Sequence, residues 1–184
     1  MKPRTNGSSS RIAAAIATFC LAAGAAGCSG PSHVKGGPFT GDPANFTYDL
    51  DGKEVTLKSG AAEERTGDKP DDVIATDLTG ARIDADFDGD DGTDCAVVVT
   101  RDAGPLKVHY LAVIRGGSSD AMTVSLGKNV LVKNLAPDPK GGVIVTMLVH
   151  DKDVPEADPP TVEVKKVFSI KTGKLVATGG TGAT

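Results

Sequence analysis

Aromatic residues are scarce in this sequence, which contains no tryptophan, two tyrosines and five phenylalanines. A glycosidase needs two carboxylates that flank the scissile bond, and its sugar substrate is usually held by stacking on aromatic rings. Here the closely spaced acidic residues fall in one short loop, and few rings are present to hold a sugar. The sequence therefore does not predict a carbohydrate-cleaving enzyme.

Basic residues are not in excess either, because 20 Lys and Arg stand against 24 Asp and Glu, for a formal net charge of −4. A protein that binds nucleic acid neutralises phosphates with clustered basic side chains. We therefore expect no nucleic-acid partner. The Gly-x-Ser-x-Gly elbow of many serine hydrolases is absent as well.

The sequence lacks an apolar run long enough for a permanent membrane span. Residues 12–26 are uncharged and mostly apolar, but fifteen residues of helix extend only about 22 Å, against a hydrocarbon core of about 30 Å. Lys2, Arg4 and Arg11 precede this stretch without any acidic residue. A basic start, a short apolar segment and small residues after it are typical of a secretory signal peptide.

The apolar stretch ends in Ala25-Ala26-Gly27-Cys28. This segment resembles the lipobox of bacterial lipoproteins, although Ala25 stands where leucine is commonest. The resemblance implies cleavage before Cys28 and a covalent lipid on its thiol. The mature protein would be exported and lipid-anchored to the cell membrane or outer membrane, facing the periplasm or the cell exterior. One acyl chain holds a protein only marginally, whereas two or three anchor it stably. Ordinary cleavage with an unmodified Cys28 is the alternative.

Cysteine is rare, and the sequence leaves only Cys95 as a free thiol in the mature chain. Cys20 would leave with the signal peptide and Cys28 would carry lipid, so no intramolecular disulfide can form. Cys95 opens the valine-rich run 95–99. We predict that it is a buried, unreactive core residue.

Removal of residues 1–27 as a signal peptide leaves 157 residues with a formal charge of −7, enough for one domain with a core. Residues 28–45, which begin with the lipidated cysteine, are rich in proline and glycine and are predicted to be a flexible tether. Residues 46–177 are predicted to form a β domain. The Gly- and Thr-rich residues 178–184 are predicted to be a flexible tail.

The predicted fold class is all-β. Asp51-Gly52 separates two alternating runs, 46–50 and 53–57, which indicates a hairpin with a type I′ turn. Further β-branched runs occupy residues 73–78, 95–100, 108–114, 122–126, 130–135, 143–149, 162–170 and 174–177. Residues 61–65 are predicted to form one helical turn. Short connections favour antiparallel neighbours, so we expect a single antiparallel meander that forms a curled sheet or a sandwich.

One segment is a candidate metal site. Residues 84–94 contain six aspartates and no basic residue. Calcium binds six to eight oxygen atoms, which a tightly curled loop supplies from alternate side chains. Numbering such a loop from Asp84 places Gly89 at the sixth position, but the twelfth is Cys95, where an EF-hand has glutamate. An acidic turn that binds no metal is the alternative.

A loop that starts at Asp86 is the favoured arrangement. It resembles the calcium loops of β-propeller and dockerin-like proteins, with Asp91 where their pattern has glycine. The predicted calcium ligands are the side chains of Asp86, Asp88, Asp90 and Asp94 and the backbone carbonyl of Gly92.

The chain also resembles a family of small bacterial envelope proteins in which an acidic D-x-N-G-D-G loop precedes an Ala-Val-Val strand. The resemblance extends over residues 46–176. The segments that carry it are 46–48, 51–57, 86–90, 96–98, 109–112, 126–127 and 159–162. It implies a fold and a compartment, but no activity.

Together these features predict a membrane-anchored, non-enzymatic lipoprotein that acts in binding or structure in the cell envelope, with calcium as a stabilising ion. Its expected partners are the membrane and an envelope protein. A calcium-dependent envelope hydrolase is one alternative, which a deep cleft with converging polar groups would favour. An inhibitor of a hydrolase is another, with residues 153–160 as the inserting loop.

Overall fold

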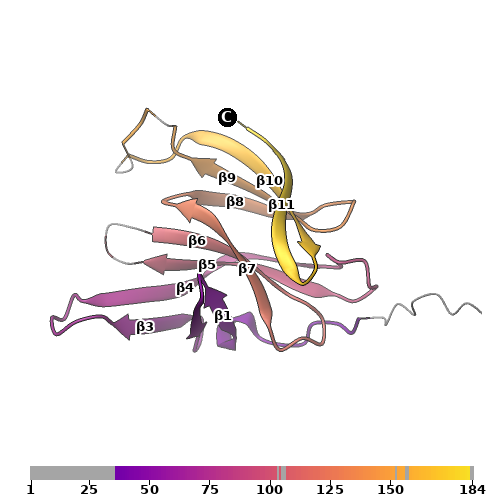
Figure 1. The fold of residues 1–184 in the computed structure, drawn as a ribbon, viewed down its shortest axis with the longest axis horizontal. Coiled ribbons are helices and arrows are strands. Elements are labelled where there is room, and N and C mark those ends of the chain that lie inside the picture. The colour runs from indigo at the N-terminus through magenta and orange to yellow at the C-terminus, as the bar shows by residue number, and fades with distance from the viewer. Residues whose placement is uncertain (1–35, 103, 105–106, 152, 156–157, 183–184) are drawn as a thin grey trace, which may run out of the picture. The chain divides into compact units, whose positions relative to one another are not determined.

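The computed structural model describes residues 36–102, 104, 107–151, 153–155 and 158–182. Almost every described element is a strand, and the strands form three antiparallel sheets (Figure 1). The predicted all-β fold is therefore confirmed. The predicted signal peptide and the predicted lipidation site at Cys28 lie outside the described residues.

The largest sheet has five strands, each paired with the next one along the chain. In spatial order they are β3 (Ala61–Arg65), β4 (Val73–Ala85), β5 (Asp94–Asp102), β6 (Lys107–Ile114) and β7 (Ala121–Lys128). The short connections between them explain why all the pairings are antiparallel.

The second sheet continues the same meander with four strands. They are β8 (Leu131–Pro137), β9 (Val143–Val149), β10 (Val162–Lys171) and β11 (Lys174–Thr181), in the spatial order β11-β10-β9-β8. The chain passes from the first sheet to the second through Asn129 and Val130, and Asn129 has a positive φ of 47°. The predicted meander is thus divided between two sheets of a sandwich.

The third sheet is the predicted hairpin of β1 (Thr47–Leu50) and β2 (Lys53–Thr56). Asp51 and Gly52 have φ values of 56° and 84°, as a type I′ turn requires. A short 3₁₀ turn, η1 (Pro43–Asn45), precedes the hairpin.

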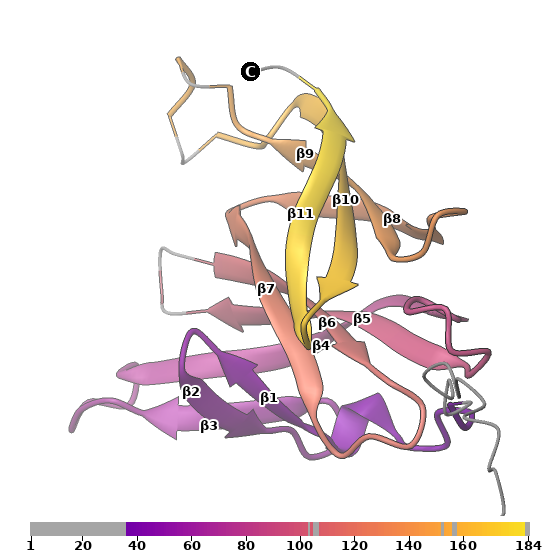
Figure 2. The same cartoon turned by 45° about the vertical axis from the view of Figure 1, so that its right-hand side comes forward.

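The three sheets are stacked as three layers, with one apolar core between each pair of neighbouring layers (Figure 2). The core between the two larger sheets includes Ala96, Val98, Leu111, Val113, Val143, Val145, Met147 and Phe168. The core between the five-stranded sheet and the hairpin includes Tyr48, Leu50, Leu57, Cys95, Val97, Val99, Tyr110 and Ala112. Because β5 and β6 contribute to both cores, they are buried on both faces. Their continuous apolar sequences follow from this position.

The prediction for residues 61–65 was wrong, because they form β3 and not a helical turn. Ala61 pairs with Asp77 and Arg65 with Val73, so the whole segment is bound to β4. Its residues are alternately exposed and half-buried, which is the strand period and not the helix period. Pairing with a neighbouring strand therefore outweighs the helix propensity of Ala, Glu and Arg.

Strand β4 is longer than predicted, since it continues past Leu78 to Ala85. The register with β5 shifts between Leu78 and Arg82, around Gly80. Such a β-bulge lets a strand bend and continue. Of the three residues at the bulge, Thr79, Gly80 and Ala81, only Thr79 is β-branched, so the sequence did not predict a strand there.

The β domain also extends further in both directions than the predicted range 46–177. The Gly36 N–H donates to the Asp90 carbonyl at 3.1 Å, and the Phe39 N–H donates to the Thr93 carbonyl at 2.7 Å. The Phe39 ring packs against Phe46, with 6.3 Å between centroids. Residues 36–45, predicted as tether, therefore lie against the domain. At the other end, β11 includes residues 178–181, which were predicted as a flexible tail.

Candidate metal centre

The acidic loop connects β4 to β5. Ala85 and Asp94 pair at the end of the two strands, so the residues between them form a closed turn. Gly89 and Asp91 have positive φ values of 80° and 65°. Aspartate tolerates this left-handed conformation better than most residues do, so Asp91 takes the place of the glycine in the predicted loop pattern.

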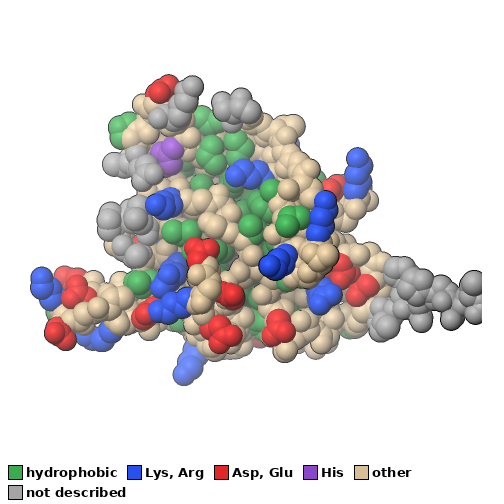
Figure 3. Space-filling view, viewed as in Figure 1, with side chains coloured by type: hydrophobic (Ala, Val, Ile, Leu, Met, Phe, Trp, Pro, Cys, Tyr) green, Lys and Arg blue, Asp and Glu red, His purple; other side chains and the backbone are tan. Residues whose placement is uncertain are grey.

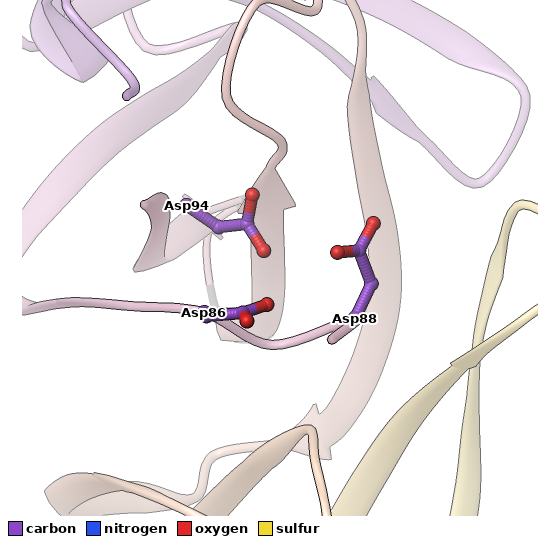
Figure 4. Close-up of side chains that lie close together, drawn as sticks. All are labelled: Asp86, Asp88 and Asp94. Carbon is purple, nitrogen blue, oxygen red and sulfur yellow. The ribbon is translucent and has the colours of Figure 1, made fainter. Parts of the chain in front are cut away.

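Three of the predicted ligands converge within this turn. Asp86, Asp88 and Asp94 each place one carboxylate oxygen so that the three oxygens lie within 4.8 Å of one another. Figure 4 shows the three side chains directed toward a common space. Calcium holds its oxygen ligands at about 2.3–2.6 Å, so oxygens on opposite sides of the ion are separated by about twice that distance. The spacing suits a cation of this size.

Asp94 is the most buried member of the group, with no exposed surface. Its Oδ2 accepts a hydrogen bond from the Phe87 N–H at 3.0 Å, and its Oδ1 accepts one from the Gly116 N–H at 2.9 Å. No ion pair joins Asp94 to a Lys or Arg in the described part of the chain. Burial raises the pKa of this carboxyl, and the two backbone hydrogen bonds oppose that effect.

Asp88 is also shielded from solvent, since its side chain is 14% exposed. Burial raises the pKa of the Asp88 carboxyl, and repulsion from Asp94 and Asp90 raises it further. The Arg115 guanidinium forms an ion pair with this carboxylate, with its Nη1 3.8 Å from Asp88 Oδ2. The loop therefore brings together three carboxylates, of which Asp88 pairs with Arg115, while Lys140 lines the hollow beside Asp86 and Asp88.

Asp86, the first residue of the predicted calcium loop, is bound to the backbone of the turn through both carboxylate oxygens. Its Oδ1 accepts a hydrogen bond from the Gly89 N–H at 2.7 Å, and its Oδ2 accepts one from the Asp91 N–H at 3.1 Å. These bonds hold the carboxylate in place beside the other two. The loop is thus organised around its acidic side chains.

The other two predicted ligands have different contacts. Asp90 is not in the converging group, and its Oδ1 accepts a hydrogen bond from the Gly92 N–H at 2.7 Å. The Asp90 carboxylate lies so close to Gly36 that a Cβ there would overlap it. Asp90 and Gly92 thus form the contact between the loop and residues 36–45, the N-terminal segment, and their part in binding an ion stays a prediction.

Sequence reasoning missed the contribution of the β6–β7 turn. Arg115 and Gly116 lie 21 and 22 positions beyond Asp94, and nothing in the local sequence relates them to the acidic loop. A Cβ on Gly116 would overlap the backbone carbonyl of Gly37 and lie 3.0 Å from the Thr93 carbonyl. Only glycine fits at this junction of three segments.

Cys95 directly follows the acidic cluster and is fully buried, as predicted. Burial, with a smaller contribution from Asp84, raises the pKa of its thiol to about 12. A thiol with such a pKa carries almost no thiolate at neutral pH, and the thiolate is the reactive form. Cys95 is therefore part of the core and not of a reactive site.

Comparison of the chain with protein-family models, with curated proteins and with solved structures found no match. In the described ranges, no helix combines the length and apolar character needed to cross a membrane. The geometry of the acidic loop is thus the main basis for a functional assignment.

Proposed function

We propose that this chain is an exported, lipid-anchored protein of the bacterial envelope whose β domain is non-enzymatic and is stabilised by one calcium ion. The support for export and anchoring is the pattern of residues 1–28, with Cys28 as the lipidated residue. The support for calcium is the arrangement of the loop between β4 and β5.

One observation carries the calcium proposal: the fully buried Asp94 carboxylate faces Asp86 and Asp88 without a described basic partner of its own. Two like charges 4 Å apart repel by about 4 kcal/mol at an effective dielectric constant of about 20. A divalent cation among the three carboxylates would convert this repulsion into attraction. The ligand atoms are all oxygens, which suits calcium better than zinc.

The ion would act on structure and not on a substrate. The loop contacts the N-terminal segment through Gly36 and the β6–β7 turn through Gly116. Fixing the loop would therefore stabilise three segments together. The predicted loop lacks a bidentate glutamate at its end, so we expect weak binding, with a Kd of about 10⁻⁴ to 10⁻³ M as in extracellular modules.

Thermal unfolding of residues 29–184 tests this proposal, because both apolar cores lie entirely within that range. Calcium at about ten times its Kd stabilises by about 1.4 kcal/mol, which raises the Tm of a domain of this size by about 3–5 °C. The comparison is between chelator and about 10 mM calcium. The double variant Asp86→Asn, Asp88→Asn should not show this calcium-dependent increase in Tm.

The matched control is Asp68→Asn, Asp71→Asn, which removes the same charge from two exposed positions of the β3–β4 connection. In this control, calcium should raise the Tm as much as it does in wild type. The proposal would be contradicted if calcium did not change the Tm of wild type, or if it raised the Tm of the loop variant by as much.

The lipid anchor is tested separately on the full-length chain. Cys28→Ala should leave the protein unprocessed or release it from the membrane fraction, because no thiol remains to accept the lipid. Mass spectrometry of the wild-type mature N-terminus should find an acylated Cys28. An unmodified cysteine, or cleavage at another residue, would refute the anchor.

A further inference from the structure

Strand β11 is an edge strand, and its only irregularity in the pairing with β10 is a register shift that leaves out Thr178. The other three edges of the two large sheets carry charges or irregularities. Strand β3 contains Glu63, Glu64 and Arg65, β7 has a register shift between Ser125 and Gly127, and β8 has Lys133 at a register shift. Beyond Lys174, β11 has neither a charged residue nor a proline, and its residues 177–181 are all exposed. Natural proteins block edges of this kind unless another strand pairs with them.

A cleft lies beside this edge. It has a volume of about 380 Å³ and lies between β7 and the β10–β11 pair. Its apolar walls are Val124 of β7, Val164 and Phe168 of β10, and Ala177 of β11. Strands β7 and β11 approach each other near the β10–β11 turn and diverge toward their C-terminal ends (Figure 2). The volume is in the range of small binding pockets.

The cleft is basic, although the protein as a whole is acidic. Lys165 and Lys166 are among its lining residues and no Asp or Glu is, although alternation directs the Lys165 side chain to the other face of β10. Side chains alternate along a strand, so Lys166 lies on the same face of β10 as Val164 and Phe168. Glu163, the acidic residue nearest along β10, pairs with Lys133 at 2.8 Å. Figure 3 shows basic and hydrophobic side chains together over the region of β10 and β11.

We propose that the β11 edge and this cleft bind an extended acidic peptide segment of a partner protein, which pairs with β11 as a fifth strand of the sheet. Backbone hydrogen bonds to β11 supply affinity in this mode of recognition, and pockets for alternate side chains supply specificity. An apolar side chain of the peptide fills the cleft between Val124 and Phe168, and a carboxylate meets Lys166. The site shares no residue with the acidic loop, so it does not depend on calcium or on the anchor.

Two variants of residues 29–184 test separately the charge in the cleft and the backbone pairing at the β11 edge. Lys166→Glu reverses the charge in the cleft. Ala177→Pro removes a backbone donor: the hairpin closes with the Lys171–Lys174 pair, so by alternation Ala177 directs its N–H away from β10. The matched control is Lys171→Glu, which makes the same charge change outside the cleft. Thermal unfolding confirms that each variant is folded.

The probe is the fluorescein-labelled hexapeptide Thr-Glu-Thr-Val-Thr-Glu, in which alternation places the valine and both glutamates on one face of the strand. Binding is followed by fluorescence anisotropy, with Thr-Lys-Thr-Val-Thr-Lys as the basic counterpart. The acidic peptide should bind saturably. Lys166→Glu should weaken it by about tenfold or more, since like charges brought together cost several kcal/mol. Ala177→Pro should weaken binding as well, and Lys171→Glu should leave it close to wild type.

Several outcomes would overturn the proposal. They are equal binding of the basic peptide, full binding by Lys166→Glu or by Ala177→Pro, and no binding at peptide concentrations up to about 1 mM, the weak end of the affinity scale. Binding of decanoate without binding of the acidic peptide would assign the cleft to an amphiphile instead. A concentration-dependent dimer in sedimentation that Ala177→Pro abolishes, without peptide binding, would assign the edge to a second copy of the chain.

Discussion

Asp86, Asp88 and Asp94 were found from the sequence because their spacing alternates around a curled loop, and a curled loop directs alternate side chains inward. The contact between Asp94 and the Gly116 N–H was not found, because these residues lie 22 positions apart and meet only after β6 has paired with β5. The spacing also does not show that Asp90 is held by Gly92. Local pattern thus predicted the cluster, and tertiary pairing determined which carboxylates enter it.

His109 is a second residue whose properties come from the fold. Its Nδ1 is buried without a hydrogen-bond partner. Burial, followed by the charge of Lys107, lowers the pKa of the His109 imidazole. The unfolded chain therefore binds a proton at a higher pH than the folded protein does, so stability falls as the pH drops below the ordinary histidine pKa of about 6.5.

We predict that His109→Leu removes this part of the pH dependence. Leucine keeps an apolar volume in the strand and cannot be protonated. Urea unfolding at pH 7.5 and at pH 5.5 should show a smaller loss of stability in the variant than in wild type, by at most about 1.4 kcal/mol for each pH unit. Titration of the carboxylates affects both proteins and cancels in the comparison. A variant that loses as much stability as wild type would show that His109 does not contribute.

At the scale of elements, most strands were predictable because β5, β6, β9 and β10 are dense in β-branched residues. The second half of β4 was not, since a bulge at Gly80 interrupts its pattern. Strand β3 was not predictable either, because its Ala, Glu and Arg residues form a strand only through pairing with β4. In both cases a neighbouring strand determines the structure, and that neighbour is not visible in a local sequence window.

We predict that the stability of the domain depends on Gly116, which lies where the acidic loop, the N-terminal segment and the β6–β7 turn meet. Gly116→Ala places a methyl group against the backbone carbonyls of Gly37 and Thr93, neither of which can move independently of its chain. We expect a loss of about 1–3 kcal/mol in the free energy of unfolding, measured by urea unfolding of residues 29–184. The control is Gly37→Ala in the same junction, where a Cβ has open space. Equal stability of the two variants would contradict this packing.

At the scale of the whole molecule, the described chain is a meander that folds into two large sheets, with a hairpin covering the outer face of the larger one. The fold class was predictable because turn residues separate short apolar runs throughout. The division into two cores was not, since the sequence of β5 shows that both its faces are apolar but not what covers each face. The acidic loop and the β11 cleft share no residue, so the calcium proposal and the peptide proposal can be tested independently.

We propose that Asp86, Asp88 and Asp94 hold a calcium ion, and an amide chemical-shift titration of ¹⁵N-labelled residues 29–184 would detect this binding at the ligands themselves. We predict saturable shifts centred on the N–H groups that donate to Asp86 and Asp94, namely those of Phe87, Gly89, Asp91 and Gly116. The expected Kd is about 10⁻⁴ to 10⁻³ M. The double variant Asp86→Asn, Asp88→Asn should not show these shifts. Unchanged shifts of these four amides with calcium up to about ten times that Kd, or equal changes in the variant, would show that these carboxylates do not hold calcium.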